Sequence, residues 1–471
     1  MNKRLLLIAI FSLIAAPALA GCATNDDTTD PTGTTEPTGT TQPTGEPTSF
    51  GVKTECDGME ESRATTTTLA SLPTAPRMTT VTPANVAQGD ALVLGTLLPL
   101  TGDLEAFGGS MENAATLAIE QINAAGGVAG SPVMLVKGDS RSDPTQAPNS
   151  FNSLLNDGVV GVAGAAASSV TGAILDIAIQ SEVVVVSPAS TSPTLTLERD
   201  NQGYFYRVPP SDALQGKVLA QLVYDAGCHS VSLLEINNAY GVGLGTVFAE
   251  TYKGLGGTIM AEVKFEEGGT TFTSQVQQAG SGSPDAIVFV GYPNTGTQIV
   301  KEAYEKGILE DSVLYFSEGV KDPEFVQNVG KNADGAYILA GLSGTTPAAS
   351  ESPELAAFKA AYNARFGADP GLFAAETYDA IMALSLAAAH AGDATSGAAI
   401  KGSMLSVYNG PGLATSGATI AAGLAAAANG DDVDYVGASG NFDWDTNGDP
   451  ADGIYSKWTV MDDGTISESD L

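Results

Sequence analysis

The stretch that most constrains the fold is residues 159–193, VVGVAGAAASSVTGAILDIAIQSEVVVVSPASTSP. Residues 159–163 and 183–186 are short runs of small and β-branched apolar residues, typical of strands that are buried on both faces of a parallel sheet. Between them, residues 170–180 place apolar side chains at helical spacing. A strand, a helix and a second strand in so short a stretch predict a right-handed βαβ unit.

Small hydroxyl residues follow both strands of this unit: Ser168, Ser169 and Thr171 after the first, and Ser187, Ser190, Thr191 and Ser192 after the second. In open α/β sheets, ligands bind just beyond the carboxyl ends of the strands. Free N–H groups at a helix start suit a carboxylate or another small anion. The same residues are also typical of ordinary N-caps and turns. Because two consecutive loops lack bulky side chains, we expect these loops to form one wall of a ligand-binding site.

Strand and helix patterns alternate along the rest of the chain. Further strands are expected at 91–98, 133–137, 204–208, 230–236, 258–264, 286–290, 312–316 and 454–460. This alternation predicts an α/β fold with doubly wound, mostly parallel sheets. Residues 91–471 exceed what one core usually spans, so two lobes are expected.

The first 22 residues have the pattern of a targeting segment. Lys3 and Arg4 precede an apolar run, residues 5–19, and the segment ends in Leu19-Ala20-Gly21-Cys22. This ending resembles the bacterial lipobox, in which the cysteine is lipidated and becomes the first mature residue. The alternative is an ordinary secretory signal that is cleaved nearby.

Two segments separate Cys22 from the first expected strand. Residues 23–49 are a low-complexity Thr/Pro/Gly tether, and residues 50–90 are an irregular lead-in, partly docked on the globular part. The lead-in contains Cys56, and one more cysteine, Cys228, follows later. These two could pair in an oxidising compartment or remain separate thiols, and their spacing leaves both open.

The chain is strongly acidic, with 54 Asp and Glu residues against 20 Lys and Arg residues and a formal charge of −34. This balance argues against nucleic acid and anionic lipid surfaces as partners. We therefore expect membrane contact through the lipid anchor only.

The sequence gives little support to an enzyme. Gly241, Gly243 and Gly245 follow a strand, but Thr246 stands where a dinucleotide fingerprint needs its third glycine, which argues against a Rossmann dehydrogenase. Asp443, in a stretch that imitates the start of a calcium loop, is followed at position twelve by Ile454 rather than Glu. We expect no metal, no cofactor and no catalytic residue.

A series of motifs resembles a known family. In order they are PLTGDLEAFGGSMENAATLAIEQINAAGGVAG, GDSRSDPTQA, SPASTSPTLT, NNAYGVGLGTVFAETYKGLGGTI, GGTTFTSQVQ, GYPNTGTQIVKEAYEKGI, FSEGV and FDWDTNGDPADG. Over nearly all of residues 91–460 they resemble the branched-chain amino-acid (Leu/Ile/Val) binding proteins of ABC transporters. The resemblance implies a type I periplasmic-binding-protein fold, in which three crossovers join two Rossmann-like lobes around a ligand cleft. The first lobe is expected to comprise residues 91–209 and 341–437, and the second residues 210–340 and 438–471.

The resemblance also implies a set of residues for the α-groups of an amino acid. Ser168 falls on the serine that meets the α-carboxylate, and Ala189 and Thr191 fall where backbone and hydroxyl bind the α-carboxylate and α-ammonium. Glu318 falls on the acidic residue that pairs with the ammonium. A charge-assisted bond of that kind is strong, although a carboxylate at a strand end can also simply be exposed to solvent.

Aromatic residues complete the implied ligand set. Tyr240 and Tyr292 fall on aromatic positions of the second lobe, and Phe107 falls where an aromatic ring packs on the ligand's side chain. The two tyrosines could equally be core or rim residues, because tyrosine is intermediate in burial.

The function implied by the resemblance is that of a monomeric, lipid-anchored, extracytoplasmic or periplasmic solute-binding protein. It would capture an amino acid, branched-chain or related, and deliver it to an ABC permease and its ATPase subunits. The alternatives are a ligand sensor for a membrane receptor and a binder of short amides, urea or aromatic acids. The sequence does not fix the ligand's side chain, its affinity or the membrane that holds the anchor.

Overall fold

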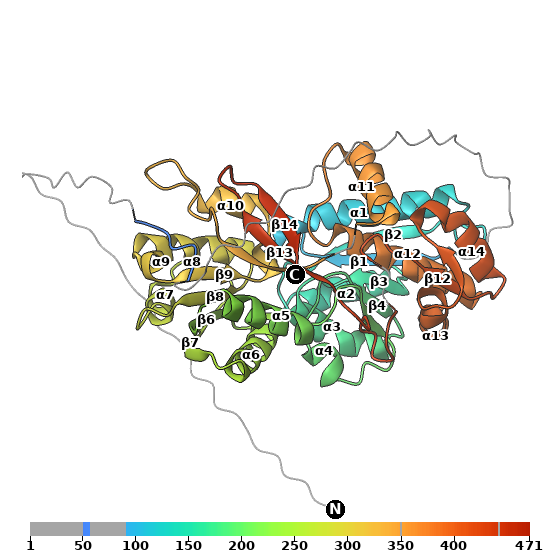
Figure 1. Ribbon diagram of the computed structural model, residues 1–471. Coiled ribbons are helices and arrows are strands. Elements are labelled where there is room, and N and C mark those ends of the chain that lie inside the picture. The colour runs from blue at the N-terminus through green and yellow to red at the C-terminus, as the bar shows by residue number, and fades with distance from the viewer. Residues whose placement is uncertain (1–49, 57–90, 349–350, 441–442) are drawn as a thin grey trace, which may run out of the picture. The chain divides into compact units, whose positions relative to one another are not determined.

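The computed structural model describes residues 50–56, 91–348, 351–440 and 443–471 (Figure 1). The expected signal segment with Cys22, the tether and most of the lead-in lie outside the described residues. All described residues belong to one unit, residues 47–471. Within these residues, no helix has the length and apolar character needed to cross a bilayer.

The first lobe is built on a five-stranded parallel sheet of order β2-β1-β3-β4-β5. Its strands are β1 (Val93–Leu98), β2 (Met134–Asp139), β3 (Gly161–Gly164), β4 (Val184–Ser187) and β5 (Phe205–Arg207). The helices that alternate with them are α1 (Glu105–Ala124), α2 (Ala147–Asn156), α3 (Ser168–Gln180) and α4 (Thr194–Leu197). This order confirms the βαβ unit β3-α3-β4 that the sequence predicted.

A later part of the chain adds more elements to the first lobe. They are α11 (Pro353–Phe366), α12 (Ala374–Ala391), α13 (Gly397–Tyr408), β11 (Leu413–Thr415), η2 (Gly417–Thr419), α14 (Ile420–Ala428) and β12 (Val433–Tyr435). Val184 and Val186 of β4 pack in one hydrophobic cluster with α1, α12 and α13, whereas Val185 packs in another with α2 and α3. Both faces of β4 are therefore covered, which explains its uniformly apolar run Val184-Val185-Val186.

The second lobe is built on a seven-stranded sheet of order β14-β13-β10-β9-β8-β6-β7. Its strands are β6 (Ser230–Ile236), β7 (Thr258–Phe265), β8 (Ala286–Val290), β9 (Val313–Phe316), β10 (Ser343–Pro347), β13 (Tyr455–Val460) and β14 (Ile466–Asp470). Its helices are α5 (Asp212–Asp225), α6 (Ala239–Gly254), α7 (Thr273–Ala279), α8 (Pro293–Glu305), α9 (Ile308–Asp311), η1 (Glu318–Val320) and α10 (Pro323–Val329). The strands pair in parallel except for β13, which pairs antiparallel with both of its neighbours, β10 and β14.

The chain passes between the two sheets three times, after β5, after β10 and between β12 and β13. The sequence placed residues 341–437 with the first lobe, but β10 pairs with β9 and β13 of the second sheet. Trp444, expected with the second lobe, stacks on Tyr408 of the first with ring centroids 3.6 Å apart. We therefore propose lobe boundaries at 347–353 and 444–455. The sequence pattern did not predict β10 as a strand, because its Gly, Ser and Pro residues are typical of turns.

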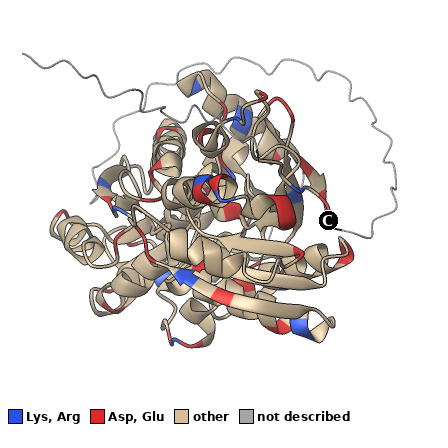
Figure 2. Ribbon diagram, turned by 90° about the vertical axis from the view of Figure 1, so that its left-hand side faces the viewer, with Lys and Arg blue, Asp and Glu red and all other residues tan. Residues whose placement is uncertain are grey.

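The structure also settles the pairing that the sequence left open, because Cys56 and Cys228 form a disulfide with their Cα atoms 5.3 Å apart. Acidic residues outnumber basic ones along the ribbon and are spread over many elements (Figure 2). Neither Cys56 nor Cys228 is among the residues that line the pocket described below.

Candidate functional site

One pocket brings together loops of both lobes at the carboxyl ends of their strands. The first lobe contributes the start of α1, the loops after β3 and β4 and the residue before α12, and the second contributes the start of α6 and the loops after β8 and β9. The lining residues are Leu104, Phe107, Met111, Ala166, Ser168, Ala189, Tyr240, Tyr292, Glu318, Gly319 and Phe373. Six of the seven residues that the sequence singled out thus lie together, and Thr191 is not among the lining residues.

The loops after β3 and β4 form one side of the pocket, and hydroxyl groups fasten them to each other. Ser168 is the first residue of α3, and its hydroxyl accepts a 3.2 Å hydrogen bond from the backbone N–H of Ser192. The hydroxyl of Ser190 donates to the carbonyl oxygen of Ala165 at 3.0 Å. Several hydroxyls that the sequence assigned to one wall of a ligand-binding site therefore hold the two loops together, while Ser168 and Ala189 reach the pocket.

Arg207, the last residue of β5, is fully buried behind these loops. Its Nε and Nη2 donate to the two carboxylate oxygens of Asp449 at 2.7 and 2.9 Å. Its Nη1 donates to the carbonyl oxygens of Ser190 at 3.3 Å and Ser192 at 2.9 Å. Sequence reasoning missed this pair. The available signal was an arginine in a buried apolar strand, because a buried guanidinium needs an anionic partner.

Glu318 begins η1 directly after β9 and is 2% exposed. The side-chain amide of Gln215 donates to its Oε2 at 2.5 Å. Burial raises the pKa of Glu318 to about 6, against hydrogen bonds with Tyr240 and Gln215 that lower it. A carboxylate held this way at a pocket wall remains ionised at neutral pH and is suited to pair with a cationic group.

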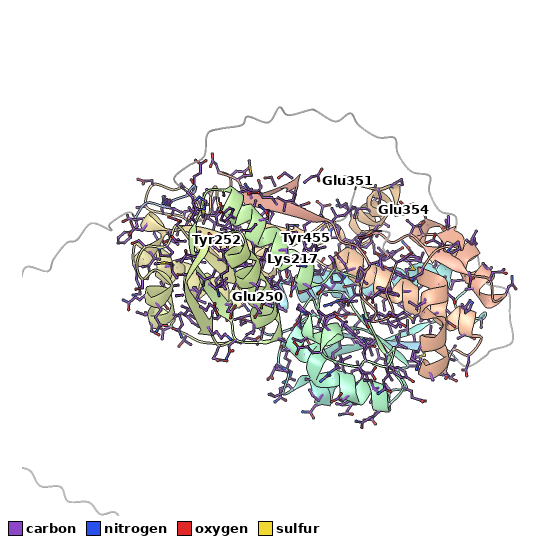
Figure 3. All side chains as sticks on the ribbon, turned by 60° about the horizontal axis from the view of Figure 1, so that its bottom comes forward. Lys217, Glu250, Tyr252, Glu351, Glu354 and Tyr455 are labelled. Carbon is purple, nitrogen blue, oxygen red and sulfur yellow. A yellow bond between two sulfur atoms is a disulfide. The ribbon has the colours of Figure 1, made fainter. Side chains whose placement is uncertain are left out.

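Thr191 lies behind the pocket wall, where it joins the first lobe to α5. Its hydroxyl donates to Oδ2 of Asp212 at 2.9 Å, and the backbone N–H of Asp212 donates to its carbonyl oxygen at 2.9 Å. Burial and the nearby carboxylate of Glu318 raise the pKa of Asp212 well above its ordinary range. Tyr455 (Figure 3) donates to the carbonyl oxygen of Ser211 at 3.3 Å, just before α5.

Tyr240 and Tyr292 form a stacked pair on the second-lobe side, with ring centroids 5.6 Å apart and planes 10° apart. The hydroxyl of Tyr240 donates to Ser317 Oγ at 2.8 Å, and that of Tyr292 accepts from the side-chain amide of Asn238 at 3.3 Å. Asn238 also caps α6, accepting hydrogen bonds from the backbone N–H groups of Tyr240 and Gly241. Both rings line the pocket with their hydroxyl groups already bonded to protein.

An apolar wall faces these groups from the first lobe. Phe107 of α1 meets Phe373 edge-to-face, with ring centroids 6.4 Å apart. Leu104 and Met111 line the pocket beside them. Of these four residues the sequence singled out only Phe107. Phe373 precedes α12, more than 200 residues away in the chain, so no local pattern marks it as part of this wall.

Hydrogen bonds across the two lobes lie near the pocket. The carboxylate of Asp103 accepts from the hydroxyl of Thr295 at 2.6 Å and from its backbone N–H at 3.2 Å. The side-chain amide of Asn294 donates to the carbonyl oxygen of Gly102 at 3.1 Å. Burial raises the pKa of Asp103, and its bonds with Thr295 oppose that rise. These contacts hold the lobes together next to the pocket.

The pocket combines a buried carboxylate, a hydroxyl at a helix start and an apolar wall. Glu318 suits a cation, Ser168 at the start of α3 suits an anion, and Phe107 and Phe373 suit an apolar group. Neither His229 nor His390 is a lining residue. The arrangement is suited to holding a small zwitterion with an apolar side chain.

Comparison with known proteins places this geometry in a family. Residues 91–455 match the family described as periplasmic binding protein. A relative in Halobacterium salinarum, the chemotactic signal transduction system substrate-binding protein BasB, is 28% identical over 367 residues. That alignment covers 75% of this chain and 84% of the relative.

Solved structures agree with this assignment. The leucine binding protein LivK from Thermotoga maritima is 27% identical with a TM-score of 0.68, covering 80% of this chain and 98% of its own. The branched-chain amino acid transporter substrate binding protein LivJ from Streptococcus pneumoniae, in complex with isoleucine, is 26% identical with a TM-score of 0.66, covering 81% of this chain and 99% of its own. The chain therefore belongs to the periplasmic binding protein family, with the type I fold, and is similar to its branched-chain amino-acid-binding members.

Proposed function

We propose that this protein captures a branched-chain or related α-amino acid between its two lobes. Glu318 would pair with the ammonium, and Ser168, with the amide groups at the start of α3, would bind the carboxylate. Ala189, which lines the pocket, would contribute its backbone to the α-groups, whereas Thr191 lies behind the pocket wall with its hydroxyl bonded to Asp212. The observation that carries the proposal is the buried carboxylate of Glu318 in one pocket with the apolar wall of Phe107 and Phe373.

Capture would work by lobe closure. A ligand that touches both lobes shifts an equilibrium between open and closed forms toward the closed one. The bonds of Asp103 with Thr295 are made only when the lobes are together, so they would add to closure. Tyr240 and Tyr292 would then cover the ligand from the second lobe, while the apolar wall reads its side chain.

A thermal-shift screen followed by calorimetry tests the ligand class. Ligands that bind only the native state raise the melting temperature. We expect leucine, isoleucine or valine to raise it, and their carboxylic acids without an amino group to have a much smaller effect. If only acids or amides lacking an ammonium group raise it, Glu318 is not an ammonium partner. If no α-amino acid does so, the proposal fails.

We further propose that the protein is lipid-anchored through Cys22, acts outside the cytoplasm as a monomer and delivers its ligand to an ABC permease with ATPase subunits. The family assignment supports an extracytoplasmic location, and the disulfide fits an oxidising compartment. Metabolic labelling with a fatty-acid probe tests the anchor, because Cys22→Ala should abolish labelling. Uptake of labelled amino acid in cells without the protein tests delivery.

A ligand sensor is the second candidate function. It is favoured by the relative in Halobacterium salinarum, whose name describes a substrate-binding protein of a chemotactic signal transduction system. In a sensor the same pocket would bind the same class of ligand, but the closed form would be recognised by a membrane receptor. Loss of chemotaxis toward the ligand with unchanged uptake in a deletion strain would favour sensing over transport.

A further inference from the structure

Residues 50–56, which we call the strap, lie on the second lobe although they precede the first strand of the first lobe. Phe50 packs edge-to-face on Tyr304 of α8, with ring centroids 6.1 Å apart. Val52 is partly buried and packs against a hydrophobic cluster that includes the core of the second lobe and part of the first. The strap is therefore seated by apolar side chains on one lobe.

Three hydrogen bonds hold the strap against α9. The N–H of Gly51 donates to Oε1 of Glu310 at 3.0 Å. The N–H of Lys53 donates to the carbonyl oxygen of Leu309 at 2.7 Å, and its Nζ donates to that of Asp311 at 3.5 Å. Three consecutive residues of α9 thus bind the strap.

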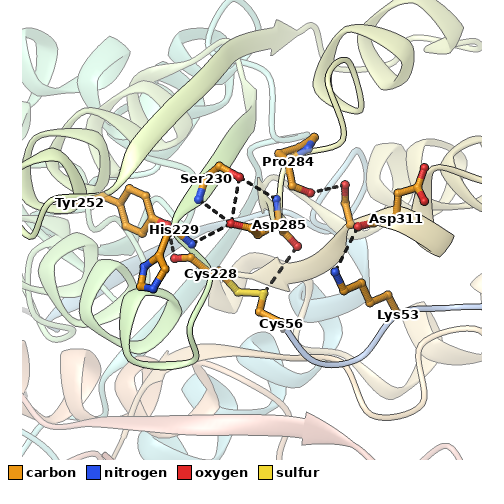
Figure 4. The surroundings of a disulfide bond; sticks show 10 residues. Lys53, Cys56, Cys228, His229, Ser230, Tyr252, Pro284, Asp285 and Asp311 are labelled. Carbon is orange, nitrogen blue, oxygen red and sulfur yellow. Dashed lines mark hydrogen bonds between the residues drawn. A yellow bond between two sulfur atoms is a disulfide. The ribbon is translucent and has the colours of Figure 1, made fainter. Parts of the chain in front are cut away.

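Cys56 ends the strap and is covalently joined to Cys228, between α5 and β6 (Figure 4). The two side chains are 4% and 0% exposed. The sulfur of Cys56 lies 3.6 Å from the carbonyl oxygen of Asp285. The carboxylate of Asp285 accepts hydrogen bonds from the backbone N–H groups of His229 and Ser230, at 2.9 and 2.8 Å. The chain on both sides of the disulfide is therefore held at the amino-terminal ends of β6 and β8, which are neighbouring strands of the second sheet.

We propose that the strap attaches the N-terminal arm of the chain to the second lobe rather than to the first, and that the Cys56–Cys228 disulfide locks this attachment. The cysteines are 172 residues apart, and the loop that they close contains the whole first sheet, β1 to β5. A force applied to the chain before residue 50 is therefore transmitted to the second lobe directly, through the strap and its disulfide, and not through the first lobe.

The disulfide joins the strap to the second lobe, and both of its cysteines lie outside the pocket lining. No residue of the strap lines the pocket. The inference therefore goes beyond the proposed function and does not depend on which ligand the pocket binds.

Hydrogen–deuterium exchange on the full chain tests the lock. In the oxidised protein, the amides of Gly51 and Lys53 should exchange about tenfold or more slowly than in the double variant Cys56→Ser/Cys228→Ser. Peptides of β8 should exchange equally in both proteins. Fast exchange of the strap in the oxidised wild type, or equally slow exchange in the double variant, would overturn the proposal. Glu55→Gln, at an exposed neighbour of Cys56, is the matched control and should behave like wild type.

A second measurement does not require the double variant to fold. A protease site is inserted into the threonine run 65–68 of the wild-type chain, which carries an N-terminal tag, and the chain is cut there. The tagged arm should remain with the body until dithiothreitol reduces the disulfide. That step transfers two electrons and two protons, giving two cysteine thiols and cyclic oxidised dithiothreitol. An arm that elutes separately before reduction, or that stays bound after complete reduction, contradicts the lock.

Discussion

The side-chain amide of Gln215 in α5 donates a 2.5 Å hydrogen bond to the carboxylate of Glu318, which follows β9. The same amide donates to the hydroxyl of Thr345 in β10 at 3.2 Å. The acidic group at the pocket is therefore oriented by the helix that follows the first crossing between the lobes and by the strand that precedes the second. The chemistry of the site is tied to the segments at the hinge.

Replacing Glu318 with Gln should weaken binding of an α-amino acid by about 30-fold or more. Truncating one member of a buried charge pair typically costs 2–5 kcal/mol, and about 1.4 kcal/mol corresponds to tenfold in affinity. Calorimetry on both proteins measures the effect. Glu324→Gln, an exposed residue of α10, is the control and should bind as wild type. Unchanged affinity in Glu318→Gln would remove Glu318 from the ligand set.

The pH dependence of stability and that of binding should run in opposite directions. The pKa of Glu318 rises from 4.5 to about 6 on folding, so the folded state binds more protons than the unfolded state between these values. The unliganded protein should therefore become more stable, by about 2 kcal/mol from this group, as the pH falls from 7 through 6 toward 4.5. Asp212, whose pKa is also raised, acts in the same direction.

Ligand affinity should instead fall below pH 6, because a protonated Glu318 no longer offers a negative charge to the ammonium. Denaturant unfolding and calorimetry at matched pH values check the two trends. Glu318→Gln should flatten the binding profile and make the stability profile shallower, because Asp212 still titrates in the variant. A wild-type affinity that is constant from pH 7 to pH 5 would contradict the assigned role of Glu318.

Asp103→Ala should speed ligand release by about tenfold, because the closed form loses the two hydrogen bonds that Thr295 donates across the lobes. Hydrogen bonds to a charged group contribute about 1.5–3 kcal/mol. Stopped-flow displacement measures the release rate, and the association rate should change less. Asp157→Asn, at an exposed position after α2, is the control. Equal release rates in all three proteins would show that these bonds do not hold the closed form.

Arg207→Met should lower the free energy of unfolding by about 3–5 kcal/mol, because it leaves Asp449 and the loop carbonyl groups without their buried partner. The double variant Arg207→Met/Asp449→Leu should recover part of this loss. Urea titrations of both variants give the two values. A double variant no more stable than the single one would mean that the carbonyl contacts, rather than the ion pair, dominate.

Local patterns predicted much of the fold. Apolar β-branched runs marked β3 and β4, and helical spacing between them marked α3, because strand and helix periodicity depends on neighbouring residues. β10 and α13 were not identified. The residues of β10 are short and polar, and only pairing with β9 and β13 makes them a strand.

The candidate site shows the same division. The residue pattern at the strand ends and the family resemblance predicted seven ligand residues, and six of them line one pocket. Thr191 was expected at the ligand, whereas its hydroxyl is bonded to Asp212 behind the wall. That bond depends on where α5 begins relative to the loop after β4, which no local pattern contains.

The sequence by itself determined the types and order of most elements, the two-lobe organisation and the polar loops at the strand ends, because these follow from residue type and short-range spacing. The tertiary structure alone decided which distant groups meet. Arg207 pairs with Asp449, which is 242 residues further along the chain, and Cys56 forms a disulfide with Cys228, which is 172 residues further along. Such partners have no signal in local composition. A buried charge or thiol shows only that a partner is needed, and the folding of the chain decides which residue supplies it.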